Sequence, residues 1–194
     1  MAKLVFGVGI NDGKYPAKIN GKNTKEYTLW MDILKRCYSE KYHLRRPTYV
    51  FCEISDNFKY YSYFYEWCQE QIGFKDGFHL DKDLLVKGNK VYSENTCVFI
   101  PCELNSLLVK VNVKRGKYPI GVYWDKTRNK FKAQVNLNVG KQKNLGYFNT
   151  ETEAFNAYKT AKENYLKELA EKWKDKIDLR AYEALMNYQV EITD

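Results

Sequence analysis

Residues 130–138 carry a basic or amide side chain at every second position, which is the pattern of a strand with one polar face. The polar residues are Lys130, Lys132, Gln134, Asn136 and Asn138. Lysine binds phosphate groups, whereas the amides of Gln and Asn can pair with purine edges in a major groove. The intervening residues, which would face a core, are Phe131, Ala133, Val135 and Leu137. The strand therefore predicts contact with nucleic acid.

The charge around this strand is concentrated. Between Lys110 and Lys143 there are ten basic residues, and Asp125 is the single acid. The whole chain has 194 residues and a formal net charge of +8, which suits a nucleic-acid partner. A second interpretation stays open, because any antiparallel sheet exposes a wet face on which Lys and Asn are common.

Three short strand-like runs between Pro119 and Phe148 precede a long amphipathic segment. Gly140 suits a hairpin turn, after which Lys141 and Lys143 are expected to extend the positive face. Thr150 followed by Glu153 has the form of a capping box and predicts a helix from Thr150 to about Trp173. We expect this helix to cover the apolar face of the sheet through Phe155, Tyr158, Ala161, Tyr165, Leu169 and Trp173.

Residues 114–172 resemble the APETALA-type (ethylene-response-factor) DNA-binding domain. The residues that carry the resemblance are Gly121-Val122, Phe131-Lys132-Ala133, Leu145-Gly146-Tyr147-Phe148, Thr150-Glu151-Thr152-Glu153-Ala154 and Ala157-Tyr158. The resemblance implies a three-stranded sheet in the major groove of double-stranded DNA, with a helix behind it. One position departs from the plant pattern, which has Arg where this chain has Tyr123, so no sequence preference is carried over.

Matched by position, the resemblance implies a set of residues that face DNA. They are Tyr123, Trp124, Lys126, Arg128, Lys130, Lys132, Gln134, Lys141 and Lys143.

The first half of the chain is expected to begin with helices, over about 27–39 and 57–71. The aromatic run from Phe58 to Trp67 fits a helix that buries one aromatic stripe in a core. Stacking on exposed bases is the second interpretation of this run. A further helix from Leu179 to about Tyr188 is expected to pack on the first half or to form a homodimer.

Residues 78–108 predict a strand (80–84), a turn (87–90), a second strand (97–100) and a helix (102–108). This unit would bring Asp81 and Asp83 near Glu103 and Asn105, and such oxygen-rich groups suit a divalent cation. Simpler roles for the Leu80-Asp81-Lys82-Asp83 segment are a cap or a surface ion pair.

This region resembles a phage branch of the His-Asn-His (HNH) nucleases. The markers are Trp30, Arg36-Cys37-Tyr38, Tyr49, Phe58, Phe64, Trp67, Leu80-Asp81-Lys82-Asp83, Gly88-Asn89, Tyr92-Ser93, Thr96-Cys97-Val98-Phe99 and Asn105. The resemblance implies a metal-dependent DNA endonuclease, in which Asp81, Asp83 and Asn105 would hold Mg²⁺ or Mn²⁺. Asp81 replaces the expected histidine and Thr96 the middle asparagine, while Asn105 matches the last position. His79, two residues before Asp81, is then the alternative base, so the catalytic candidates are His79, Asp81 and Asn105.

A second basic segment, with Lys41, Arg45 and Arg46 around His43, suggests either another phosphate contact or a solvated loop. The five cysteines have no CxxC spacing, which predicts reduced thiols, with a zinc site assembled in space as the alternative. We find no apolar run of eighteen residues and no signal-peptide pattern, and therefore expect a cytoplasmic protein with no membrane contact.

The sequence thus predicts an α+β protein: an HNH-like helical and ββα domain over 1–109, a basic linker over 110–118, and a DNA-binding sheet with helices over 119–194. The predicted function is that of a phage-type protein that binds double-stranded DNA, with or without metal-dependent cleavage. The alternative is an inactive phage protein that binds and inhibits a host nucleoprotein or defence complex.

Overall fold

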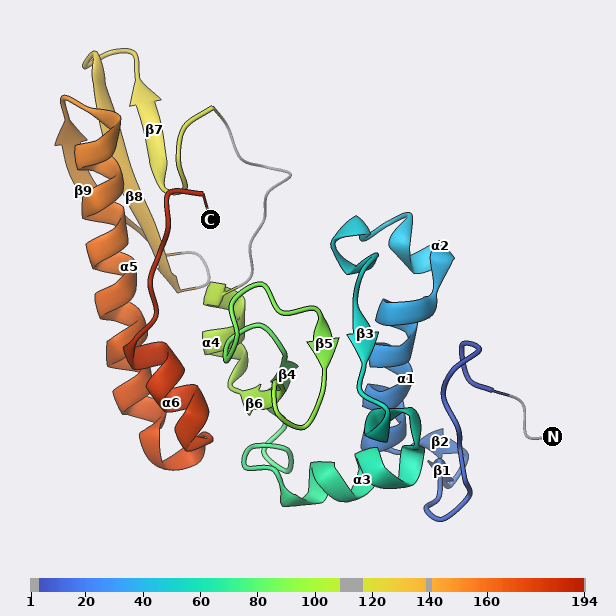
Figure 1. Ribbon diagram of the computed structural model, residues 1–194. Helices are drawn as coiled ribbons and strands as arrows, with labels where there is room; N and C mark the ends of the chain where they lie inside the picture. The colour runs from blue at the N-terminus through green and yellow to red at the C-terminus, as the bar shows by residue number, and fades with distance from the viewer. Residues whose placement is uncertain (1–3, 109–116, 139–140, 194) are drawn as a thin grey trace. The chain divides into compact units, whose positions relative to one another are not determined.

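The computed structural model describes residues 4–108, 117–138 and 141–193, which form two compact units (Figure 1). The first unit comprises Met1–Phe99 and the second Ile100–Asp194. The fold is of the mixed α+β class, as the sequence predicted. Most of the expected linker, 110–118, and the expected turn residue Gly140 lie outside the described residues. The boundary between the units falls inside strand β6 (Val98–Ile100), so the helix that follows it belongs to the second unit.

Two helices form the centre of the first unit. Helix α1 (Lys25–Tyr38) begins at Thr24, whose side chain accepts a hydrogen bond from the backbone N–H of Tyr27. Helix α3 (Tyr61–Glu70) packs beside α1, and the indole of Trp30 donates to the carbonyl oxygen of Phe58 at 2.8 Å. Trp30, Phe58, Tyr61, Phe64, Trp67 and Cys68 are all buried in one core. The core interpretation of the aromatic run is therefore confirmed.

Short strands complete this unit. Strand β3 (Glu53–Ile54) pairs in parallel with β5 (Val91–Tyr92), and β4 (His79–Asp81) pairs with β6. The remaining elements are β1 (Lys18–Ile19), β2 (Lys22–Asn23), α2 (Glu40–His43), and the 3-10 turns η1 (Pro47–Tyr49) and η2 (Asn57–Lys59). Four of the five cysteines are buried and all five are free thiols, as expected.

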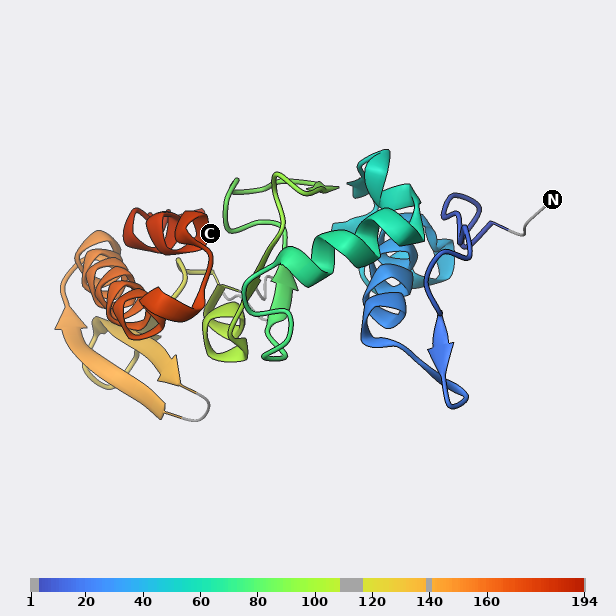
Figure 2. The ribbon, with the colours of Figure 1, turned by 90° about the horizontal axis from the view of Figure 1, so that it is seen from below.

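The second unit is a three-stranded antiparallel sheet with a long helix on one face (Figure 2). The sheet has the order β7-β8-β9. Helix α5 starts at a complete capping box, in which Thr150 and Glu153 each bind the other's backbone N–H, as predicted. The elements are α4 (Cys102–Leu108), β7 (Val122–Asp125), β8 (Lys130–Asn138), β9 (Lys141–Phe148), α5 (Glu151–Trp173), η4 (Lys174–Lys176) and α6 (Leu179–Met186).

The core of the second unit lies between the sheet and α5. Ala133 and Val135 are almost completely buried, and Phe131 and Leu137 pack against the same core. The side of α5 that is buried differs in part from the expected one, because Lys162 and Leu166 take places predicted for Ala161 and Tyr165. After Tyr158 these two predicted positions were placed one residue too early for the helical period. Helix α6 packs on α5 within this unit, through a face that includes the buried Ala181 and Leu185.

Gly121 allows the sheet and the helix to approach closely. Its φ angle is +78°, and a Cβ atom built there would lie 2.1 Å from the ring of Tyr158 on α5. Any larger residue would therefore meet both backbone strain and a collision with an aromatic ring that the core holds in place.

We expect Gly121→Ala to lower the free energy of unfolding by at least about 1 kcal/mol more than Gly88→Ala does. Gly88 has nearly the same φ, +77°, but a Cβ atom there would meet nothing within 4 Å. The control thus carries the backbone strain without the collision. Urea unfolding of both variants measures the difference, and equal losses would show that Tyr158 yields without cost.

Lys162 is a buried cation whose ammonium group donates to the carbonyl oxygen of Leu107 at 2.9 Å. Burial lowers the pKa of Lys162 from 10.5 to about 8. Between pH 8 and 10.5 the folded state consequently binds fewer protons at this site than the unfolded state, so this group makes the protein more stable as pH rises.

The variant Lys162→Met should lose that part of the pH dependence. We expect its stability relative to the wild type to be highest near neutral pH and to fall between pH 8 and 10.5, by at most about 3 kcal/mol. Urea unfolding of both proteins across this range measures the difference, which cancels the titration of the other lysines. A difference that stays constant with pH would contradict the lowered pKa.

Candidate nucleic-acid interface

The face of the sheet opposite α5 presents a row of side chains across all three strands. The register pairs Lys132 on β8 with Tyr123 on β7 and with Tyr147 on β9. Directly paired residues point to the same face, and Lys132 alternates with the buried Ala133. Tyr123 is 52% exposed, although it is a large aromatic residue. A lysine between two tyrosines therefore forms the centre of the outer face.

Two rows of amide side chains continue this face along β8 and β9. Gln134 pairs with Asn144, and Asn136 pairs with Gln142. The register shifts between Ala133 and Gln134, so that Leu145 on β9 is an extra residue. Gly146, next to it, has a φ of +126°, which a residue with a Cβ rarely adopts. Asn144 Oδ1 accepts a hydrogen bond from the N–H of Gly146 at 3.1 Å and so stabilises the bulge.

Arg128 is held over the outer face by two contacts. Its guanidinium carbon lies 4.5 Å from the centre of the Tyr147 ring, and its Nη1 lies 3.2 Å from the carboxylate of Asp125. That carboxylate also accepts hydrogen bonds from the backbone N–H groups of Thr127 and Arg128, which close the turn between β7 and β8. Hydrogen bonding, first from the Thr127 hydroxyl, holds the pKa of Asp125 below its usual value. The one acid between Pro119 and Phe148 is thus engaged in the turn.

Two residues expected on the outer face lie on the other one. Trp124 pairs with Phe131, and their rings meet edge to face with centres 4.8 Å apart. Lys143 pairs with Val135, which is 1% exposed and packs on the helix side. The resemblance placed both residues there, and alternation counted from the turn expected at Gly140 also placed Lys143. A register shift between Asn136 and Asn138 moves Lys143 to the other face, because Gln142 rather than Lys143 pairs with Asn136.

The other predicted residues whose side chains the structure describes lie at outer or exposed positions. Lys126, Arg128 and Lys130 are exposed around the β7–β8 turn, and Gln134 lies on the outer face. Lys141 pairs with Asn138, and the side chains of both lie outside the described residues.

Sequence reasoning missed Gln142, Asn144 and Tyr147 on this face. Their positions depend on the two register shifts between β8 and β9, and the sequence signals only the second of these, through the glycine at 146.

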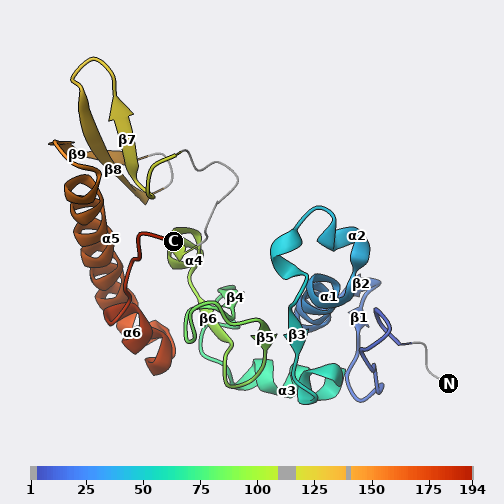
Figure 3. The same ribbon diagram turned by 45° about the horizontal axis from the view of Figure 1, so that its top comes forward.

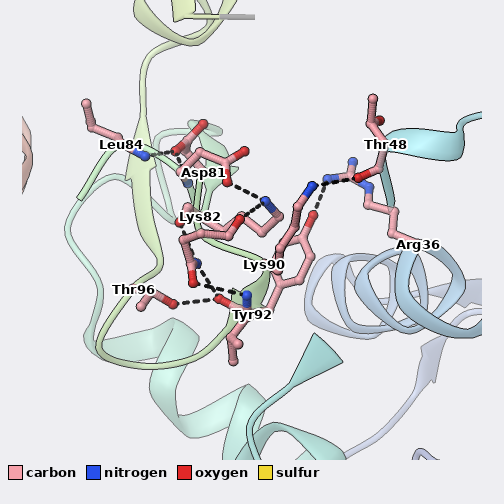
Figure 4. Close-up of polar contacts among 11 residues, drawn as sticks. Arg36, Thr48, Asp81, Lys82, Leu84, Lys90, Tyr92 and Thr96 are labelled. Atoms are coloured by element: carbon pink, nitrogen blue, oxygen red, sulfur yellow. Dashed lines mark hydrogen bonds and ion pairs between the residues drawn. The ribbon is translucent and has the colours of Figure 1, made fainter. Parts of the chain in front are cut away.

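In the first unit, Asp81 closes a turn. Its Oδ1 accepts hydrogen bonds from the backbone N–H groups of Asp83 (2.8 Å) and Leu84 (2.7 Å), as Figure 4 shows. Burial raises the pKa of the Asp81 carboxyl, while these two N–H groups oppose the shift. His79 lies on the same strand, β4, two residues earlier and with an exposed side chain. Among the described residues no helix follows directly after Asp81, so it closes a loop turn rather than capping a helix, and the ion pair considered for this segment forms between Lys82 and Asp83.

Lys82 and Asn89 hold the loop that follows. The ammonium group of Lys82 pairs with Asp83 and donates to the carbonyl oxygen of Asn89 at 2.7 Å (Figure 4). The side-chain amide of Asn89 donates in return to the carbonyl oxygens of Lys82 and Val91. Thr96, at the middle position of the HNH resemblance, donates to the carbonyl oxygen of Val91 at 2.7 Å. These polar residues bind one another's backbone and fix the loop.

The predicted carboxylate ligands of the first unit already bind other groups of the protein. Asp81 Oδ1 accepts two backbone N–H groups, and Asp83 is paired with the ammonium group of Lys82. Asn105 and Glu103 lie on α4 in the second unit, where Glu103 Oε2 accepts from Lys172 at 2.7 Å and from the indole of Trp173 at 3.1 Å. Within the described part of the chain, no three His, Cys, Asp or Glu side chains converge as metal ligands would. All five cysteines are among these described residues, and none of them belongs to such a group.

Comparisons with known proteins give no relative. No protein-family model matches the chain, and no curated protein or solved structure shows significant similarity to it. Among the described residues, no helix has the length and apolar character needed to cross a membrane.

Asp81→Asn and Asp81→Ala should separate a structural role of this carboxylate from a role of its charge. Asn keeps the oxygen that accepts the two N–H groups, so we expect its free energy of unfolding to equal or exceed that of the wild type at neutral pH. Ala leaves both donors without that partner and should cost about 1–3 kcal/mol. Urea unfolding measures both, and equal destabilisation by Asn and Ala would refute the role in the turn.

Proposed function

We propose that this protein binds double-stranded DNA through the outer face of the β7–β9 sheet. The observation that carries the proposal is the composition of that face, on which Lys132 lies between two tyrosines and is followed by two rows of paired amides. The opposite face is buried by α5, so these side chains are the ones that the sheet offers to a partner.

The chemistry of the face matches two components of a duplex. Lys130 and Lys132 supply the positive charge that phosphate contacts require, and binding would release counterions from the DNA. Amide side chains such as Gln134 and Asn136 have both donors and acceptors and can pair with adenine in the major groove. A ribbon of two or three strands fits the width of that groove.

Arg128 is prepared for the same contact. Its stacking on Tyr147 and its ion pair with Asp125 restrict the side chain before any partner arrives. A pre-ordered guanidinium group loses less conformational entropy on binding, and it can bind guanine or phosphate with two hydrogen bonds. We therefore assign Arg128 to recognition at the edge of the sheet that the β7–β8 turn forms.

Binding, rather than cleavage, is the activity that we propose. In the first unit, the carboxylates that match the nuclease resemblance serve a turn and an ion pair. The second unit, in contrast, has a cationic surface that the fold itself does not require.

Lys132→Glu tests this proposal, with Lys143→Glu as the matched control. Both variants change the charge of the same sheet by the same amount, but Lys132 lies on the outer face and Lys143 on the helix side. Fluorescence anisotropy of a labelled duplex, measured over a range of salt concentrations, gives the affinity and its salt dependence. We expect Lys132→Glu to weaken binding and to lower the slope of log K against log salt by about one.

The control should keep a slope close to that of the wild type. If the two variants bind alike, the outer face is not the contact surface. Circular dichroism and urea unfolding of each variant exclude loss of the fold as the cause.

A further inference from the structure

A loop of the first unit exposes large apolar side chains next to arginines. Among the described residues, Leu44 (88% exposed) and Phe51 (79%) are the two most exposed large hydrophobic side chains, and Val50 is also exposed. Arg45 and Arg46, which are both exposed, follow Leu44 directly. We call residues 44–51 the apolar–basic loop. Exposure of this kind costs free energy in water, and it marks a surface for a partner.

The charge of this loop has one sign. No Asp or Glu occurs between Lys41 and Cys52, a stretch that contains Lys41, Arg45 and Arg46. A further exposed lysine, Lys90, reaches the loop from β5's side, where its ammonium group donates to the carbonyl oxygen of Thr48 at 2.9 Å (Figure 4). The partner of the loop should therefore combine negative charge with an apolar surface.

Contacts with residues outside the loop hold it in place, so its exposed side chains belong to an ordered segment. Figure 3 shows it with α2 at one end of α1. The ring of Tyr42 on α2 lies 5.7 Å from that of Tyr49, which holds the loop against α2. The guanidinium group of Arg36 lies 5.8 Å from the Tyr49 ring and donates to the hydroxyl of Tyr92 at 3.3 Å. His43 Nε2 is 2.8 Å from the carbonyl oxygen of Arg36.

Nucleic acid fits this combination better than a membrane or a protein does. Phosphates match the arginines, and the bases offer an apolar surface into which side chains such as Phe and Leu can insert. An interfacial membrane helix buries an apolar face in the lipid, whereas α2 has four residues, two of them charged, and offers no such face. A protein partner would need an acidic and an apolar surface side by side, whereas every step of a duplex supplies phosphates next to stacked bases.

We propose that the apolar–basic loop is a second DNA contact, in which Arg45 and Arg46 bind phosphates and Phe51 inserts between base pairs. The choice of DNA rests on the proposed function of the sheet, whereas the exposed residues and their charge do not. An inserted Phe51 would unstack one base step and kink the duplex.

The test uses the full chain and short duplexes that carry 2-aminopurine at successive positions, because its fluorescence rises when the base unstacks. We expect the wild type to raise the fluorescence at one step and Phe51→Ala to lose that rise. Ile72→Ala is the control, because Ile72 is also exposed (54%) in the same unit but lies outside the loop. Arg45→Glu with Arg46→Glu should weaken binding and lower the salt slope by about two.

The outcomes separate this proposal from that for the sheet. If Phe51→Ala unstacks the duplex as the wild type does, or if the double arginine variant keeps the affinity and slope, the loop is not a DNA contact. This holds even when Lys132→Glu weakens binding. The loop variants can lose the fluorescence rise and the affinity of the wild type while Lys132→Glu binds DNA as the wild type does. In that case the loop proposal stands and the sheet proposal fails. Phe51-dependent sedimentation with phosphatidylserine vesicles, without an effect on DNA, would assign the loop to a membrane instead.

Discussion

The packing of α5 against one face of the three-stranded sheet is the contact on which the chemistry of the second unit depends. A strand shows alternate side chains to opposite faces, so burial of Ala133 and Val135 leaves Lys132 and Gln134 on the other side. Gly121 allows the helix to approach the sheet, because Tyr158 occupies the place where a Cβ atom would lie. If the strand shifted by one residue, the lysine and amide face would turn into the core.

Clustering of like charge on this sheet opposes folding, since the repulsion is present before any partner binds. The structure offsets this repulsion at one place, the β7–β8 turn, and does not pair every cation with an acid. Asp125 is engaged by the turn and by Arg128, and Arg128 stacks on Tyr147. The buried contacts between the sheet and α5 provide the rest of the stability. The duplex that we propose as a partner would relieve this repulsion, because its phosphates would replace the counterions.

The first unit shows how one set of residue types can satisfy two different interpretations. Closely spaced carboxylates before a glycine turn and a helix are typical of a metal site, yet they are equally suited to binding backbone N–H groups and an ammonium group. In this chain Asp81 caps the turn, while Lys82 and Asn89 bind across the loop. Buried polar groups need partners, and these residues provide them for one another.

Local features were determined by the sequence by itself. The cap at Thr150, the helix over 102–108, the aromatic core stripe and the alternation of 130–137 all follow from interactions within a few residues. Tertiary structure decided which face Trp124 and Lys143 occupy and that Lys162 is buried. Pairing with Phe131 sets the face of Trp124, register shifts between β8 and β9 set that of Lys143, and the packing of α5 buries Lys162. All of these are contacts between segments that are distant in the chain. A periodic pattern contains the period of a strand or helix, but not the register in which it meets its neighbour.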